Sequence, residues 1–193
     1  LLNSSHKYEE ASKHFKNYGI MMDNVRVDLG QMMKQKETAV SNLTSGIEYL
    51  FKKNKVDYMK GWGRFDDKNT IIQLDEPLYT ISVDLIEGKN EKILAKNTII
   101  ATGSEPSELP GGALKIDENR VISSTGALSL KEIPKKLALI GGGVIGLEMG
   151  SVYSRLGSEV TVIAFMDSIM PAFDKEVTKT FTQLLKKRGF KFN

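Results

Sequence analysis

Residues 137–146 read LALIGGGVIG, an apolar run that passes directly into a glycine-rich turn. Residues 147–157 have the composition of a helix, and a second β-branched run follows at 159–163. The order strand, glycine turn, helix, strand is the setting in which a G-x-G-x-x-G pattern indicates dinucleotide binding. We therefore predict an α/β fold in which a Rossmann-type unit occupies the C-terminal part of the chain.

Each glycine of this pattern has an expected role. Gly141 would permit a tight turn, Gly143 would let the backbone approach a pyrophosphate, and Gly146 would let the helix pack closely on the strand. The free N–H groups at the helix N-terminus carry partial positive charge and would hold the phosphates. The alternative is a glycine turn with a purely structural role.

The acidic residue expected about 20 residues further along, which would hold a ribose hydroxyl pair, is missing. Its position at the end of the second strand falls on Ala164, and Asp167 follows three residues later in a loop. Asp167 is a candidate substitute. The sequence places no arginine nearby to accept a 2′-phosphate, so the loss does not argue for NADP.

The bulk composition excludes several classes of function. A net charge of +3 is too small and too dispersed to favour nucleic acid, and no apolar run is long enough to span a membrane. The chain has no cysteine, so no disulfide, thiolate or cysteine-based metal chemistry is expected within it. His6 and His14 lie two helical turns apart and do not suggest a metal site. Both ends look cut, which indicates a fragment.

The N-terminal half predicts helices followed by a small meander. Residues 1–17 favour a helix ended by Gly19, and Asp28 with Gln31 has the form of a capping box that starts a helix reaching Asn54. The strand-like runs are 56–59, 70–74, 80–86 and 92–101. We divide the chain into residues 1–104, a loop-rich linker at 105–134, and the dinucleotide unit at 135–193.

Four stretches together resemble the dihydrolipoamide dehydrogenases, flavin disulfide oxidoreductases of the 2-oxo acid dehydrogenase complexes. They are residues 51–56 with Gly61-Trp62-Gly63, residues 99–104, the run Ser123-Ser124-Thr125-Gly126-Ala127-Leu128, and residues 141–150. The resemblance implies part of an FAD-binding domain (helices plus a small β-meander) at 1–104, followed by the first half of a Rossmann-type NAD-binding domain. It also implies that the redox-active cysteines and the His-Glu acid/base pair lie outside this chain.

The resemblance implies roles for particular residues. The FAD contacts would be Gly63, Thr102, Gly103 and Ser104. Glu148 matches a glutamate beside the flavin and nicotinamide, where it would be a buried carboxylate lacking its lysine partner. The NAD site would comprise Gly141, Gly142, Gly143, Val144, Ile145, Gly146, Leu147, Glu148 and, at the ribose position, Ala164.

The parent reaction implied is oxidation of protein-bound dihydrolipoyl groups with NAD as the acceptor, with FAD as the second cofactor and no metal. The implied partners are a second copy of the parent protein, the 2-oxo acid dehydrogenase complexes and their lipoyl domains. The implied location is the mitochondrial matrix. Alternatives are another pyridine nucleotide–disulfide reductase and an inactive nucleotide-binding remnant. Residues 75–80 look like part of an insertion at a loop.

Overall fold

The computed structural model describes residues 1–73, 76–112 and 114–193. These residues form two compact units, one made of Leu1–Ala39 with Pro106–Asn193 and the other of Val40–Glu105. The boundaries of the three segments predicted from the sequence stay a prediction.

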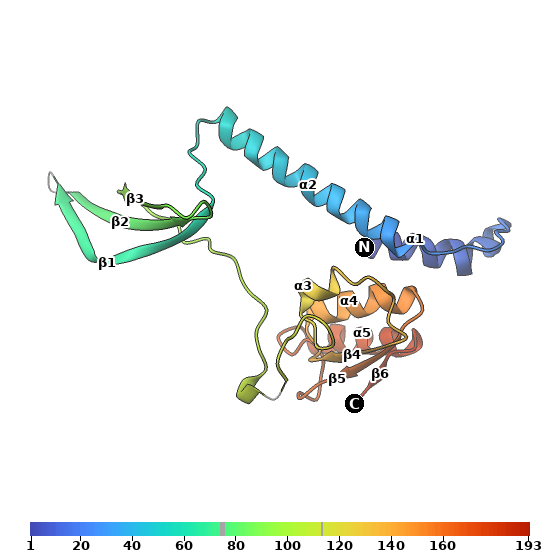
Figure 1. Cartoon of the computed structure of the whole chain (residues 1–193). Coiled ribbons are helices and arrows are strands. Elements are labelled where there is room, and N and C mark those ends of the chain that lie inside the picture. The colour runs from blue at the N-terminus through green and yellow to red at the C-terminus, as the bar shows by residue number, and fades with distance from the viewer. Residues whose placement is uncertain (74–75, 113) are drawn as a thin grey trace. The chain divides into compact units, whose positions relative to one another are not determined.

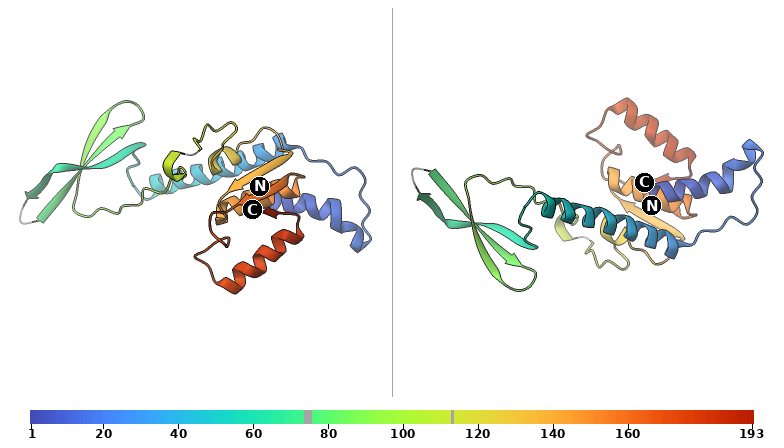
Figure 2. Two further views of the ribbon diagram at one scale, coloured as in Figure 1. Left: turned by 90° about the horizontal axis from the view of Figure 1, so that it is seen from below. Right: turned by 90° about the horizontal axis from the view of Figure 1, so that it is seen from above.

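The C-terminal part of the first unit is a parallel βαβαβ arrangement (Figures 1 and 2). Strand β4 (Lys136–Ile140) leads through helix α4 (Val144–Arg155) to β5 (Glu159–Ile163). Helix α5 (Lys175–Lys187) then leads to β6 (Lys191–Phe192). The strand order is β4-β5-β6, and both pairs are parallel. This confirms the predicted Rossmann-type unit.

The core of this arrangement lies between the sheet and its helices. Val160 and Val162 alternate with more exposed residues along β5, as expected for a strand with one face buried. Leu147 from α4 and Leu185 from α5 are almost fully buried on the same cluster. Helix packing on the strands therefore fixes where the loops at the carboxyl ends of β4 and β5 emerge.

The N-terminal segment packs on the outer side of α4. Helix α1 (Leu2–Glu9) continues as a π-helical turn, η1 (Glu10–His14), and a 3-10 turn, η2 (Phe15–Tyr18). Gly19 ends it with φ 76°, which confirms the predicted glycine cap. Leu1 and Tyr8 pack on a buried cluster of Val152, Tyr153 and Leu156. Arg155 Nε lies 3.3 Å from Glu9 Oε2 in a largely buried ion pair.

Helix α2 (Leu29–Lys53) begins where the capping box predicts. The Gln31 N–H donates to Asp28 Oδ1 at 2.9 Å, which satisfies one of the free donors of the first turn. Leu29 and Met32 pack on the cluster around Tyr153. Further along, the apolar face is exposed instead of packed, at Val40, Leu43, Ile47 and Leu50.

The second unit contains an antiparallel meander of β1 (Gly61–Gln73), β2 (Glu76–Leu85) and β3 (Asn90–Ala95). The predicted strand at 56–59 is wrong, because that segment is in neither helix nor strand. Residues 61–67, predicted to interrupt the strands, belong to β1. The ladder with β2 holds residues 61–65 extended, since Gly61 pairs with Leu85 and Phe65 with Ile81, and the register shifts between Phe65 and Thr70.

Two further expectations about the meander need correction. Of the predicted insertion, Asp75 lies outside the described residues, and Glu76 to Thr80 belong to β2 and not to a loop; Tyr79 pairs with Thr70. The expected strand 92–101 ends at Ala95, and residues 98–101 are in neither helix nor strand. Among the described residues no strand pairs with 98–101, and an apolar run without a ladder partner has nothing to hold it as a strand.

The connection between the meander and β4 contains two short helical turns, η3 (Pro110–Gly112) and α3 (Ser124–Ala127). The Ser123 hydroxyl accepts the Thr125 N–H at the start of α3. The Tyr153 hydroxyl donates to the Ala127 carbonyl at its end. This bond ties the connection to α4.

Candidate functional site

The glycine turn joins β4 to α4 at the carboxyl end of β4. Gly141 has φ 93°, in the left-handed region that favours glycine, and its N–H donates to the Ile163 carbonyl at 2.7 Å. At Gly142 a Cβ would lie 2.7 Å from Ile169 Cγ2 and 2.9 Å from Ile169 Cα. The loop after β5 therefore packs directly on Gly142, and the Met170 N–H donates to its carbonyl at 2.9 Å.

Gly143 is the N-cap residue of α4. A Cβ at Gly143 would meet nothing within 4 Å, so the space over the turn is open. Within residues 114–193 no side chain caps this end of α4. The N–H groups of Val144, Ile145 and Gly146 therefore face the start of the helix with room for a phosphate, which such N–H groups bind well. The turn fits the pyrophosphate of a dinucleotide.

The close packing expected at Gly146 occurs at Gly150 instead. A Cβ at Gly146 would touch only the Gly141 carbonyl oxygen, at an ordinary 3.9 Å. At Gly150 it would lie 2.7 Å from Leu139 Cδ1 and 3.2 Å from Phe190 Cε1. The reason is the geometry of the helix, which faces the sheet one turn after Gly146. The signal in the sequence was a glycine inside a predicted helix, where it otherwise lowers stability.

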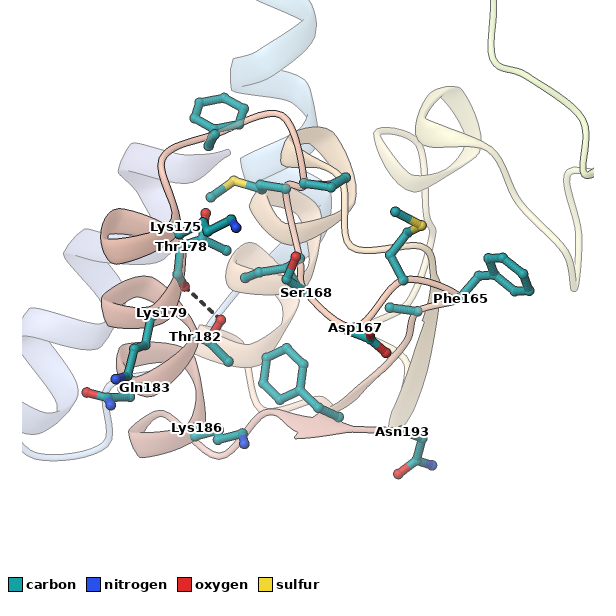
Figure 3. A pocket seen from close by; sticks show the side chains of 17 residues that line it. Phe165, Asp167, Ser168, Lys175, Thr178, Lys179, Thr182, Gln183, Lys186 and Asn193 are labelled. Atoms are coloured by element: carbon teal, nitrogen blue, oxygen red, sulfur yellow. Dashed lines mark hydrogen bonds between the residues drawn. The ribbon is translucent and has the colours of Figure 1, made fainter.

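Ala164 directly follows β5. Its N–H donates to the Asn193 carbonyl at 3.2 Å, and the residue is partly buried. It borders a cavity of about 800 Å³ between the 164–173 loop, α5 and β6 (Figure 3). Asp167 is exposed and also lines this cavity. Lys175, Lys179 and Lys186 of α5 line it too, a feature that the sequence did not reveal.

The remaining predicted site residues are Glu148, which lies in α4 just after the glycine turn, and the four residues expected at FAD. From the sequence, a buried carboxylate is expected at Glu148. In this chain Glu148 is exposed, in the second turn of α4. Gly63 is exposed in β1, and Gly103 has φ 77° between the exposed Thr102 and Ser104. Gly63, Thr102, Gly103 and Ser104 all belong to the unit formed by residues 40–105. Their roles at FAD stay predictions.

A parallel βαβαβ unit with an uncapped, glycine-bordered helix N-terminus defines the class of dinucleotide-binding proteins with a Rossmann-type fold. Over residues 1–193 the chain matches the family model described as pyridine nucleotide-disulphide oxidoreductase, and it belongs to that family.

Individual relatives are similar to the whole of this chain. The chain is 54% identical over 192 residues to a protein of Pisum sativum named mitochondrial dihydrolipoyl dehydrogenase, covering all of this chain and 36% of that protein. It is 55% identical to a leghemoglobin reductase of Vigna unguiculata, covering 34% of it. The chain thus spans about a third of the length of these relatives. The solved structure of LpdA from Mycobacterium tuberculosis has a TM-score of 0.84 and 22% identity, covering all of this chain and 39% of that one, and it supports the fold.

No helix among the described residues is long and apolar enough to cross a membrane. Those residues also contain no group of three or more His, Cys, Asp or Glu side chains placed to hold a metal ion.

Proposed function

We propose that this chain is the middle part of a flavin-dependent dihydrolipoyl dehydrogenase, which oxidises protein-bound dihydrolipoyl groups and passes the electrons through FAD to NAD. The observation that carries the proposal is the open, uncapped glycine turn at residues 141–146, in a chain that is 50–55% identical to proteins named for this activity or for a related reduction. FAD and NAD supply the electron-transfer chemistry, and the protein supplies binding and orientation.

In this proposal each part of the chain has a binding task. The N–H groups of Val144, Ile145 and Gly146 bind the NAD pyrophosphate, with Gly143 leaving room for its approach. Leu147 lies below that turn, and Glu148 faces the reacting rings once the complete protein surrounds it. Gly63 with Thr102, Gly103 and Ser104 contacts FAD. Residues 1–104 act as part of the FAD domain, 105–134 as a linker and 135–193 as the start of the NAD domain.

The proposal extends to partners and location. The complete protein acts as a homodimer with 2-oxo acid dehydrogenase complexes and their lipoyl domains. It resides in the mitochondrial matrix, because several relatives of similar identity are named mitochondrial, including those of Pisum sativum and Dictyostelium discoideum.

The test uses the complete protein that carries this chain. We expect purified protein to contain FAD and to reduce NAD with dihydrolipoamide. The variant Gly143→Val places a side chain in open space with an extended backbone (φ −77°), so folding should be unaffected while the dinucleotide is obstructed. We expect its KM for NAD to rise at least about tenfold. Flavin reduction by dihydrolipoamide, which does not need the NAD site, should stay normal.

Reduction of a haem protein is a second candidate, because two relatives at 55% and 51% identity are named leghemoglobin reductase. Assaying the same preparation with ferric leghemoglobin and with dihydrolipoamide separates the two. A protein that lacks FAD, or that turns over neither substrate, would contradict both proposals and favour an inactive remnant.

A further inference from the structure

The cavity beside Ala164 has a composition that the NAD proposal does not explain. One wall is the 164–173 loop and the opposite wall is α5 (Figure 3). Phe192 of β6 also lines the cavity. Its volume of about 800 Å³ is within the range of small-molecule sites. It opens where β5 ends, which is where the adenosine ribose of a bound dinucleotide lies in such folds.

Positive charge dominates the described residues that line this cavity. Lys175, Lys179 and Lys186 come from α5, and Asp167 is the one acid among them. Figure 3 shows Lys175 and Lys186 on the side of α5 that faces the loop, with Lys179 directed away. Lys186 Nζ lies 5.7 Å from the centre of the Phe192 ring, so its ammonium group is held at the cavity. An anion entering between the loop and α5 meets more cations than carboxylates.

Ala164 removes the group that normally rejects a phosphate at this position. A carboxylate at the end of β5 accepts hydrogen bonds from the ribose hydroxyls of NAD. The same carboxylate repels a 2′-phosphate, so it selects against NADP by like-charge repulsion. With alanine there, the favourable contact and the repulsion from that position are both absent, and Asp167 is the carboxylate that remains in the cavity lining. The remaining electrostatic preference comes from the lysines.

We propose that the cavity formed by the 164–173 loop and α5 accepts an adenosine 2′-phosphate, so that the protein binds NADP as well as NAD. This inference rests on the proposed dinucleotide function. Lysine ammonium groups bind phosphate as point charges without the fixed geometry of an arginine fork. The preference should therefore weaken as ionic strength rises.

The test compares three nucleotides by titration calorimetry on the complete protein at low salt: 5′-AMP, 2′,5′-ADP and 3′,5′-ADP. We expect 2′,5′-ADP to bind about fivefold or more tightly than 5′-AMP, and 3′,5′-ADP to gain less. The double variant Lys175→Gln/Lys186→Gln should lose this preference while its affinity for 5′-AMP is unchanged. Lys187→Gln is the matched control, because Lys187 is exposed on the same helix outside the cavity lining.

The outcomes separate the two proposals. Equal affinities for 5′-AMP and 2′,5′-ADP would overturn the 2′-phosphate inference and leave NAD binding intact. An equal gain for 3′,5′-ADP, or a preference that survives the double variant, would also overturn it, because the charge would not act at the 2′ position. Failure of all three nucleotides to bind would contradict the proposed dinucleotide function itself.

Discussion

Two glycines of α4, Gly146 and Gly150, differ in what surrounds them. Gly146 has open space where a side chain would begin, whereas Gly150 lies against the buried side chains of Leu139 and Phe190. The first is therefore free to serve a ligand, and the second is required by packing of the helix on the sheet. A substitution at Gly146 should therefore affect ligand binding, and a substitution at Gly150 should affect the stability of the fold.

Gly150→Ala should destabilise the protein. The added methyl group overpacks the core, which costs about 1–3 kcal/mol, and the gain in helix propensity offsets about 1 kcal/mol of this. We expect a net loss of about 1–2 kcal/mol, measured by urea denaturation followed by circular dichroism. The control Gly146→Ala should stay within about 0.5 kcal/mol of the parent. A stabilised Gly150→Ala variant would contradict the close approach.

Ala164→Glu should strengthen NAD binding in the complete protein. A carboxylate there can accept from both ribose hydroxyls, and hydrogen bonds to charged groups contribute about 1.5–3 kcal/mol each. Water at the ribose hydroxyls offsets part of this, so we expect a net gain of about 1–3 kcal/mol, or about 5- to 150-fold in Kd. NAD titration measures it. An unchanged Kd for NAD would mean that Ala164 is not the ribose position or that Asp167 already fills the role.

At the scale of elements, the turn at 117–121 is held by one carboxylate. Asp117 Oδ1 accepts the N–H groups of Asn119, Arg120 and Val121 at 2.9, 2.8 and 2.9 Å. These backbone N–H groups lower the pKa of the Asp117 carboxyl below its ordinary value, and the N–H of Asn119 has the largest effect. The turn leads directly into the cap of α3, since Glu118 accepts the Ser123 hydroxyl at 2.5 Å.

The lowered pKa of Asp117 gives a pH dependence with a definite sign. A carboxyl whose pKa is lower in the folded state stabilises the protein above its unfolded pKa, and that contribution is lost as the pH falls through the folded pKa. Asp117→Asn should therefore have a lower Tm than the parent at pH 7, and the difference should shrink below about pH 4. Glu132→Gln, which removes another exposed carboxylate of the same unit, is the control. A Tm difference that is constant with pH would contradict this account.

At the scale of the whole molecule, the two units differ in how much apolar surface they bury. The parallel unit has a closed core around Val160 and Leu185. In the unit formed by residues 40–105, the apolar face of α2 is exposed, and Ile99 and Ile100 are 90% and 71% exposed. Among the described residues, the unit formed by residues 40–105 therefore buries less apolar surface than the parallel unit does.

The chain of 193 residues should have no dihydrolipoamide:NAD activity on its own. Electron entry from a dithiol requires exchange with a protein disulfide, and the chain contains no cysteine. We expect NAD reduction by the purified chain with added FAD to equal that of FAD alone. Turnover above that flavin control would show that a route without cysteine exists.

The sequence by itself determined the βαβαβ unit, because alternating apolar runs, glycines and caps are local signals that tertiary packing reinforced. It also located the start of α2 at Asp28. It could not find the long β1–β2 hairpin, because ladder pairing keeps residues 61–65 extended despite the two glycines among them.

Only the tertiary structure decided which residues surround Ala164. The lysines of α5 lie 11 to 22 positions along the chain from it, and no local pattern assigns them to its cavity. Residues 164–173 and helix α5 enclose one space, because the loop and then the helix follow the carboxyl end of β5. The same packing places the close helix–strand contact at Gly150, where a Cβ would lie 2.7 Å from Leu139 Cδ1 and 3.2 Å from Phe190 Cε1.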